Sequence, residues 1–428
     1  MRIFIGLTEV ANCVHNYSKG FREHGADVFT VLAERARAYR ASHYDVILAE
    51  TLGTPPAAAG LGNALRRLVW RVRYHLVVLR AVITCDVFIF NFGSSFRSDR
   101  WDFHILRALG KRIICVFLGD DTRYWYAYTR EAEILGTDGD IRPYLDEVLK
   151  GREHDYLAVK LQTVRKAEAY AHLILAVPDA AQLQVRPYMR LNIPIDLSGI
   201  EFGIPDREVP LIVHAPSVRN IKGTDHVLAA IDQLRAEGIQ FEFRLIEGLP
   251  NDELRALLEQ SDIVIDQMYS ETIATFALEG LAAGNVVLAR YLADRVRVGP
   301  DCPVVNVNVH TLVGRLREVI LNRGLRRQLA SAGRPYVEKH HSHLVVTRQI
   351  LDWLESPPAH FDFYPSFFAD HFSMSVTLAE RERKLIEAEP AYMRALAEAG
   401  LAGVRFDQPN AVEGSRSELR ETPGSRAI

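Results

Sequence analysis

Short, uninterrupted apolar segments alternate with helical segments along most of this 428-residue chain. Strands of a parallel sheet have this continuous apolar character, because helices cover the sheet on both faces. In the first half of the chain, strands are predicted at residues 2–6, 26–31, 44–48, 86–92, 111–117 and 171–177. This pattern predicts an α/β fold with a doubly wound parallel sheet.

The same alternation begins again after a proline-spaced stretch at residues 193–210. Strands are predicted at residues 210–215, 240–246, 262–266 and 285–289, with helices between them. Such a restart predicts two similar Rossmann-like domains in series, with the boundary near residues 198–209. We therefore expect an N-terminal Rossmann-like domain at 1–205 and a C-terminal Rossmann-like domain at 206–350.

The end of the chain has a different composition. Residues 351–405 are expected to form a helical extension, with a charged helix at 375–401 and one part packing back on the N-terminal domain. Residues 406–428 are glycine, serine, proline and charged residues with almost nothing to bury, so we expect a disordered tail.

Charge and cysteine spacing exclude several classes of protein. The 51 Lys and Arg residues against 54 Asp and Glu residues give a formal net charge of -3, which argues against a nucleic-acid-binding protein. The cysteines have no short spacing, so neither a zinc knuckle nor a disulfide framework is expected. The most apolar stretch, residues 76–92, is interrupted by Arg80 and Asp86, and residues 1–10 lack the features of a signal peptide. A cytoplasmic location is therefore expected.

The densest group of polar residues follows the predicted strand at 210–215. Its loop carries Ser217, Arg219 and Lys222, and a helix is predicted to begin near residue 224. Two cations beside a helix N-terminus suit an anion such as a diphosphate. The alternative is a solvated loop with ordinary surface charges.

Two glutamates follow the predicted strand at 262–266. Glu271 lies in the loop, and Glu279 lies eight positions later in a helix that is predicted to begin near Ala274. A carboxylate accepts hydrogen bonds from sugar or ribose hydroxyls, and the backbone N–H groups of Ala274, Thr275 and Phe276 suit a phosphate.

Both segments resemble a known family. HAPSVRNIKGTDHVLAAI and SDIVIDQMYSETIATFALEGLAAGNVVLA are similar to the group 1 (family 4) retaining glycosyltransferases. NFGSSF, LRALGKRIICVFLGDDTR and LNIPIDL look like the looser equivalents in the first half. The resemblance implies the GT-B fold, in which two Rossmann-like domains face each other across a cleft and the C-terminal one holds the nucleotide-sugar donor.

The resemblance also implies roles for the residues that match. Arg219 and Lys222 would contact the donor diphosphate, with Lys222 the closer match. Glu271 would lie near the donor sugar and Glu279 would bind the ribose, with no metal and no other cofactor required. Where relatives often have glycines between the two glutamates, this chain has Thr272, Ile273, Ala274 and Thr275.

The chain differs from the family near the predicted reaction centre. Leu118 stands where many relatives have a histidine, and Asp120 and Asp121 follow it. Either these aspartates contact the substrate or activity is impaired, and the alternative is that they cap the following helix. His214 is expected to pack at the end of its strand and to bond to the backbone.

Residues 61–83 are predicted to form an amphipathic helix. Its apolar face consists of Leu61, Leu65, Leu68, Val69, Val72, Leu76 and Leu79. Arginines and a histidine occupy the other face, with Trp70 and Tyr74 among them. One interpretation is peripheral contact with an anionic membrane at its inner face. The other is an ordinary helix with its apolar face on the sheet and a solvated basic face.

These observations together predict a retaining glycosyltransferase. It would move a sugar from a nucleotide-diphosphate sugar to a hydroxyl of a glycan or lipid-linked acceptor, in surface polysaccharide or glycan biosynthesis. One alternative is a nucleotide-sugar epimerase or hydrolase of the same fold. The other is a catalytically silent GT-B protein that serves as a binding or scaffold partner.

Overall fold

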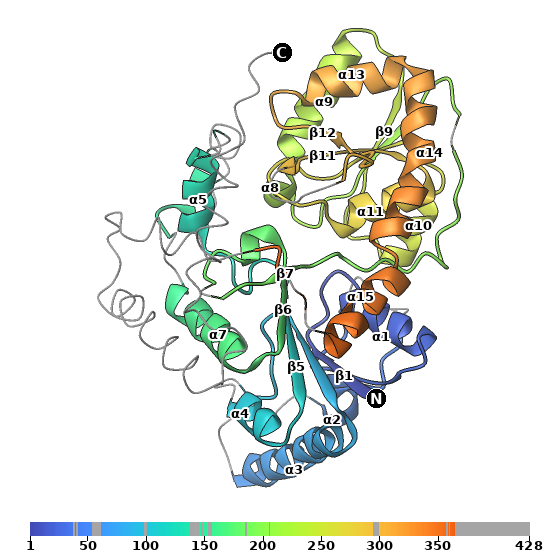
Figure 1. The fold of residues 1–428 in the computed structure, drawn as a ribbon. Coiled ribbons are helices and arrows are strands. Elements are labelled where there is room, and N and C mark those ends of the chain that lie inside the picture. The colour runs from blue at the N-terminus through green and yellow to red at the C-terminus, as the bar shows by residue number, and fades with distance from the viewer. Residues whose placement is uncertain are drawn as a thin grey trace. The chain divides into compact units, whose positions relative to one another are not determined.

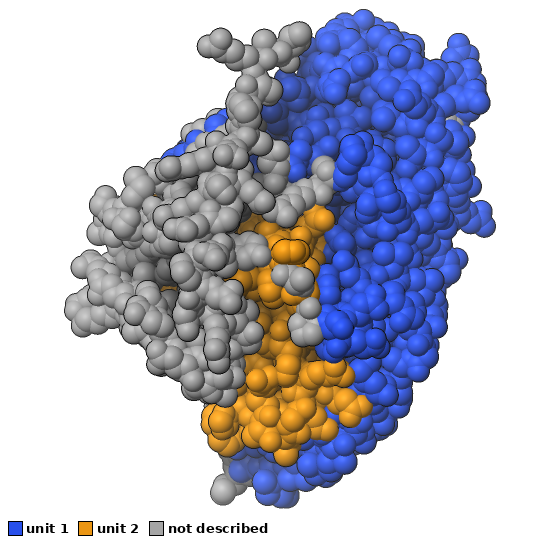
Figure 2. Space-filling view, in the orientation of Figure 1, with its two compact units in different colours: residues 1–85, 129–152, 192–357 blue, residues 86–128, 153–191, 358–428 orange. Residues whose placement is uncertain are grey.

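The computed structural model describes most of the chain up to residue 363 and divides it into two compact units. The described residues are 1–36, 39, 42–53, 61–97, 101–134, 136, 142, 145–146, 149–152, 156–184, 186–204, 206–293, 299–356, 358 and 360–363. Unit 1 comprises residues 1–85, 129–152 and 192–357, and unit 2 comprises residues 86–128, 153–191 and 358–428 (Figure 2). Residues 364–428, with the predicted charged helix and tail, lie outside the described residues. The predicted domain boundaries stay predictions.

The first half of the chain forms a seven-stranded sheet with the order β3-β2-β1-β4-β5-β6-β7 (Figure 1). Its strands are β1 (Arg2–Leu7), β2 (Asp27–Leu32), β3 (Val46–Ile47), β4 (Val87–Asn91), β5 (Arg112–Phe117), β6 (Leu173–Ala176) and β7 (Met189–Arg190). β1, β2 and β3 pair in parallel in unit 1, and β4 to β7 pair in parallel in unit 2. The interior of β1 is fully buried, which is why its apolar run is continuous.

Helices connect these strands. They are α1 (Cys13–Glu23), α2 (Leu48–Leu52), α3 (Leu61–Thr84), α4 (Trp101–Ala108), α5 (Trp125–Ile134), α7 (Leu157–Tyr170) and the short 3-10 helix η1 (Pro178–Ala180). The six strands predicted for this half are confirmed. β7 was not predicted, because two residues are too short to show a sequence period.

The second half forms a five-stranded parallel sheet with the order β12-β11-β10-β8-β9. Its strands are β8 (Leu211–His214), β9 (Glu242–Leu245), β10 (Ile263–Ile265), β11 (Val286–Ala289) and β12 (Val305–Asn306). The four predicted strands are confirmed, and β12 is again two residues long. Because the chain leaves β8 toward β9 on one side and later returns to β10 on the other, the strand order reverses between β8 and β10. Ligands of open parallel sheets bind beyond the carboxyl ends of strands at such a point.

Seven helices of the described chain belong to this half. They are α8 (Arg219–Lys222), α9 (Thr224–Ala236), α10 (Asn251–Leu258), α11 (Thr275–Ala283), α13 (Leu312–Leu321), α14 (Arg323–His340) and α15 (His343–Glu355). The predicted helix starts near residues 224 and 274 are confirmed. The loop that was expected to carry Arg219 and Lys222 is itself a single helical turn.

Close helix packing fixes α11, the helix that carries Glu279. A Cβ atom added to Gly333 of α14 would lie 2.6 Å from the carbonyl oxygen of Leu281 in α11. Gly333→Ala is therefore expected to lower the free energy of unfolding by about 1–3 kcal/mol, since α14 must move away from α11. Gly314→Ala in α13 is the matched control, because a Cβ atom there meets nothing within 4 Å. That substitution should stabilise the protein by up to about 1 kcal/mol. Chemical denaturation of both variants measures the difference, and equal effects would contradict the packing argument.

Candidate functional site

His214 connects the two strands at which the order of the second sheet reverses. It ends β8 and is fully buried. Its Nδ1 atom lies 2.8 Å from the carbonyl oxygen of Ile265 in β10, and its Nε2 atom lies 3.0 Å from Oγ1 of Thr224, the first residue of α9. Burial lowers the pKa of His214 below its usual value. The prediction that this histidine packs and bonds to the backbone is confirmed, and its role is to fix the start of α9 against β10.

Lys222 lies at the end of α8 and reaches the loop that follows β10. Its Nζ atom donates hydrogen bonds to Oδ1 of Asp266 at 2.5 Å and to Oε1 of Gln267 at 3.2 Å. The backbone N–H of Met268 donates to the carbonyl oxygen of Lys222 at 3.3 Å. Gly223 follows with φ of 70°, and a Cβ atom there would lie 2.8 Å from Cβ of Met268. Lys222 therefore places its charge at the carboxyl end of β10, where the sheet geometry expects a ligand.

Arg219 and Ser217 have other surroundings. The Arg219 guanidinium forms two hydrogen bonds with the Glu247 carboxylate, from Nε at 2.7 Å and from Nη2 at 2.6 Å. This hydrogen bonding raises the pKa of Arg219 and lowers that of Glu247. Both side chains are nearly half exposed, and Ser217 is exposed as well. The two cations of the predicted diphosphate site thus have different partners, and only Lys222 contacts the loop after β10.

The loop that carries Glu271 is held from inside the protein. The buried guanidinium of Arg290, at the end of β11, donates from Nη1 to the carbonyl oxygens of Tyr269 and Ser270, each at 3.1 Å. The Gln267 side chain donates to the carbonyl oxygen of Thr272. Glu271 itself is 1% exposed, and its carbonyl oxygen accepts from the N–H of Leu292 at 3.0 Å. Side-chain contacts therefore hold the shape of this loop, which has no glycine between Glu271 and Phe276.

α11 begins directly after this loop, with Ala274 as its N-cap residue. No side chain caps the helix, so the first-turn N–H groups at Thr275 and Phe276 are not used by a capping residue. Glu271 thus precedes the helix start as predicted. The N–H groups of an uncapped helix start are suited to a phosphate, and the phosphate role of Ala274, Thr275 and Phe276 stays a prediction.

Glu279 lies one turn inside α11 and is 1% exposed. Its carboxylate accepts hydrogen bonds from Arg255, at 2.9 Å from Nε and 2.8 Å from Nη2, and from the Asn251 amide at 3.0 and 3.2 Å. Burial raises the pKa of Glu279, while Arg255 and Asn251 oppose that rise. Sequence analysis missed Asn251 and Arg255. The one indication in the sequence was that they are four residues apart, and therefore on one face of a helix that follows β9.

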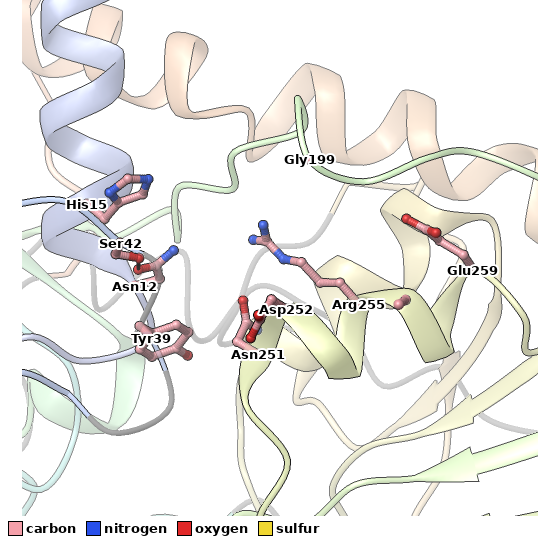
Figure 3. Close-up of a pocket in the computed structure, with 10 residues that line it drawn as sticks. Asn12, His15, Tyr39, Ser42, Gly199, Asn251, Asp252, Arg255 and Glu259 are labelled. Atoms are coloured by element: carbon pink, nitrogen blue, oxygen red, sulfur yellow. Dashed lines mark hydrogen bonds between the residues drawn. The ribbon is translucent and has the colours of Figure 1, made fainter.

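Asn251 and Arg255 also line a cavity within unit 1 (Figure 3). Its volume is about 370 Å³, near the lower limit for small-molecule sites. The other lining residues are Asn12, His15, Tyr39, Ser42, Gly199, Asp252, Ala256 and Glu259. Asn12 and His15 follow β1, at another carboxyl strand end. Beside them the half-buried Glu9 accepts hydrogen bonds from the N–H groups of Val14 and His15 and from the Tyr44 hydroxyl.

Asp120 and Asp121 belong to unit 2. Asp121 accepts hydrogen bonds on Oδ1 from the N–H groups of Leu118 at 3.1 Å and Gly119 at 2.9 Å. Asp120 pairs with Arg123, whose guanidinium also contacts the buried Asp179. The bonds of Asp121 run to residues that precede it, so they hold the turn after β5 and do not cap α5, which starts at Trp125. The capping interpretation is therefore wrong for Asp121.

Burial of Asp121 has a consequence for pH dependence. It raises the pKa of this carboxyl from 3.8 to about 7, against the lowering effect of the two N–H donors. The folded state therefore holds this proton more tightly than the unfolded state, and the stability it contributes is present below about pH 4 and lost as pH rises through about 7. We expect Asp121→Asn to reduce the loss of thermal stability between pH 5 and pH 8. Asp120→Asn, on the exposed neighbour, should leave that loss unchanged.

In the described part of the chain, no group of three or more His, Cys, Asp or Glu side chains has an arrangement that could hold a metal ion. No helix in these segments is long and apolar enough to cross a membrane. The expectation that no metal is required stays a prediction.

No protein-family model matches the sequence, and no curated protein matches it. Solved structures are similar at low identity. A sucrose-phosphate synthase from Thermosynechococcus elongatus superposes with a TM-score of 0.56 and 11% identity, over 83% of this chain and 98% of that one. Anabaena HepE, in complex with UDP and glucose, gives a TM-score of 0.53 and 12% identity, over 83% and 99%.

An α-glucosyltransferase in complex with UDP-glucose and DNA containing an abasic site gives a TM-score of 0.52 and 12% identity. The match covers 83% of this chain and all of that one. At such identities the likeness establishes the fold alone. Together with the two parallel sheets, these matches show that the chain has the GT-B fold, with two Rossmann-like α/β domains.

Proposed function

We propose that the protein is a retaining glycosyltransferase that uses a nucleotide-diphosphate sugar as donor. The observation that carries this proposal is the position of Lys222 and the α11 N-terminus at the carboxyl end of β10, where the order of the sheet reverses. A cation and the N–H groups of a helix start that no side chain caps suit a diphosphate. Two structural neighbours, one in complex with UDP-glucose and one in complex with UDP and glucose, support this choice of donor.

In this proposal the diphosphate is the leaving group. Negative charge develops on it as the bond to the sugar breaks, and Lys222 and the N–H groups at Thr275 and Phe276 stabilise that charge. The leaving diphosphate accepts the proton of the attacking hydroxyl on the same face of the sugar, so the anomeric configuration is retained. Glu271 positions the sugar. No metal takes part, and the acceptor is a hydroxyl of a glycan or a lipid-linked saccharide.

Titration calorimetry with UDP, GDP and ADP, followed by release of nucleoside diphosphate from the matching nucleotide sugars, tests the proposal. Binding with turnover supports a transferase, and NMR of the product gives the configuration of the new bond. Binding without turnover on any acceptor would favour the silent scaffold, and an epimerised donor would favour the epimerase. Absence of nucleotide binding would exclude the proposed function.

The structure bears separately on the proposed membrane contact, because the apolar face of α3 points to solvent. Its side chains are between 50% and 69% exposed: Leu65, Leu68, Val69, Val72, Leu76, Leu79 and Ile83. The side chain of Leu61 lies outside the described residues. Instead, Ala81 is buried, and Trp70 donates a hydrogen bond to the carbonyl oxygen of Gly53. The interpretation in which the apolar face packs on the sheet is therefore wrong.

The charge of α3 suits an anionic lipid surface. At 3.6 residues per turn the exposed apolar side chains cover an arc of about 100°. Arg66, Arg73 and Arg80 flank one edge of this arc, and His75 and Arg71 flank the other, while no acidic residue occurs between residues 61 and 84. A second copy of the same basic helix would be repelled, whereas each arginine near an anionic bilayer contributes about 1 kcal/mol. We therefore propose that α3 lies in the interface of such a membrane.

Cosedimentation with vesicles measures this contact. The protein is expected to bind vesicles that contain phosphatidylglycerol and not vesicles of phosphatidylcholine alone. Replacing Leu68 and Leu76 by serine should weaken binding by about tenfold or more, since two apolar side chains no longer leave water. Leu321→Ser is the control, because Leu321 is 66% exposed on α13. Equal binding by all forms, or self-association through α3 in the absence of lipid, would exclude the membrane contact.

A further inference from the structure

Asn251 and Arg255 cover the carboxylate of Glu279 on the side of the cavity. They lie four residues apart on α10 and therefore on one face of that helix. Oε1 of Glu279 accepts from both residues and Oε2 accepts from Asn251, and the glutamate is 1% exposed. Both covering residues line the cavity, whereas Glu279 does not. A ligand in the cavity thus meets Arg255 and Asn251 before it meets the glutamate.

Arg255 has one donor group left for a ligand. Its Nε and Nη2 atoms are used by Glu279, and no described residue accepts a hydrogen bond from Nη1. The guanidinium points into the space in front of α10, toward Asn12 and Ser42 (Figure 3). Gly199 leaves room beside it, since even an added Cβ atom would lie 3.6 Å from Nη1. The guanidinium is planar, so Glu279 fixes the direction of the remaining N–H groups.

The charges around the cavity favour a neutral ligand group. Glu279 compensates the charge of Arg255, and the exposed carboxylates of Asp252 and Glu259 lie at the lining. A phosphate would meet net negative charge here. A hydroxyl group accepts from Arg255 Nη1 and donates to a carboxylate or amide oxygen, so hydroxyl-rich groups such as ribose match this lining.

We propose that Arg255 contacts the ribose hydroxyls of the donor nucleotide and that Glu279 acts through it as a positioning residue. This inference rests on the proposed function and deepens it. It differs from the sequence-based prediction, in which Glu279 touches the ribose itself. The division of roles follows from burial: the carboxylate is saturated on Oε1 and covered, whereas the guanidinium keeps an unused donor at the cavity.

The experiment compares ribose with 2′-deoxyribose. Calorimetry gives the affinities of the wild type for UDP, GDP and ADP and for their 2′-deoxy counterparts, and the ratio within the tightest pair measures recognition of the hydroxyl. Arg255→Met should lower the affinity for the ribonucleotide about tenfold and bring the ratio close to one. Arg255→Lys keeps a cation beside Glu279 and thus protects folding. It should nevertheless lose most of the preference for the ribonucleotide over the 2′-deoxyribonucleotide. Arg235→Met on α9 is the control.

A double variant separates the two residues. If Arg255 contacts the ribose, the contact is already absent in Arg255→Met. Adding Glu279→Gln should then change neither the affinity for the nucleotide nor the ratio of ribonucleotide to 2′-deoxyribonucleotide affinity. The double variant also removes the buried carboxylate that Arg255→Met leaves without its cation. A further loss of affinity in the double variant would show that Glu279 touches the ligand directly and would overturn the inference.

The remaining outcomes are distinct. If the wild type binds no nucleotide, the proposed function fails and this inference fails with it. If the wild type binds nucleotides and both Arg255 variants keep the wild-type ratio, the proposed function stands and the inference is wrong. A wild type that binds ribonucleotide and 2′-deoxyribonucleotide equally well also overturns it.

Discussion

Glu168→Gln is expected to lower the stability of unit 2 by about 3–5 kcal/mol, the cost of breaking a buried ion pair from one side. Glu168 is fully buried in α7 and accepts hydrogen bonds from Arg165 at 2.8 Å, from the Tyr188 hydroxyl at 2.8 Å and from the N–H of Arg186 at 3.3 Å. Arg165 and Arg186 are themselves only 6% and 2% exposed. Glutamine keeps the shape and one acceptor, so the variant leaves two buried cations without their anion.

Hydrogen exchange in peptides from α7 and β6 measures this effect, since a chain of two units need not unfold in one step. Glu237→Gln is the matched control. Glu237 pairs with Arg317 at 2.7 Å, but both side chains are about one-third exposed. Removing that pair should cost far less, because water screens charges that are this exposed. Similar losses in the two variants would show that the buried network contributes no more than a surface pair.

Lys222→Ala is expected to reduce the rate of sugar transfer by about 100- to 1,000-fold, the usual effect of losing one group that stabilises developing charge. The reason is its position: Lys222 is 12% exposed and reaches Asp266 and Gln267 beside the proposed leaving group. Steady-state kinetics with a saturating donor measures the loss.

Arg219→Ala provides the comparison for Lys222. Arg219 is about half exposed and its guanidinium is engaged by Glu247, so we expect a loss of less than about tenfold. Equal losses would show that Arg219 leaves Glu247 when the donor binds and that both cations act on the diphosphate. Because Lys222→Ala leaves the buried Asp266 without its cation, the double variant with Asp266→Asn controls for folding. Full activity of Lys222→Ala would remove Lys222 from the proposed mechanism.

The pattern of apolar residues along the chain was sufficient to predict most strands of the two sheets. Nine of the ten predicted strands are almost entirely buried, and a strand buried on both faces is apolar at nearly every position, whatever it packs against. The tenth, β9, lies at the edge of the second sheet, and its apolar residues alternate with the exposed Glu242 and Arg244. The helix starts near Thr224 and Thr275 could also be predicted, since they follow strands in a repeated α/β pattern. The two-residue strands β7 and β12 could not, because they exist only through pairing with a neighbour.

The sequence predicted which residues belong to the candidate site and where they lie in the chain. It did not predict which side chains they contact. Sequence placed Arg219 and Lys222 in one loop, and the fold gave them different partners, Glu247 from the segment after β9 and Asp266 from the end of β10. Asn251 and Arg255 showed no motif, because Asn251 lies 28 residues and Arg255 lies 24 residues before Glu279, and only the packing of α10 against α11 brings them together.

α3 shows the same division between sequence and structure. The sequence determined an amphipathic helix, since its apolar and basic residues follow the helical period. It did not determine which face packs on the protein. Only the tertiary structure decided this, because Trp70 bonds to Gly53 and Ala81 is buried, while seven leucine, valine and isoleucine side chains of the apolar face stay exposed. Local periodicity determines which residues share a face, and long-range packing decides what that face meets.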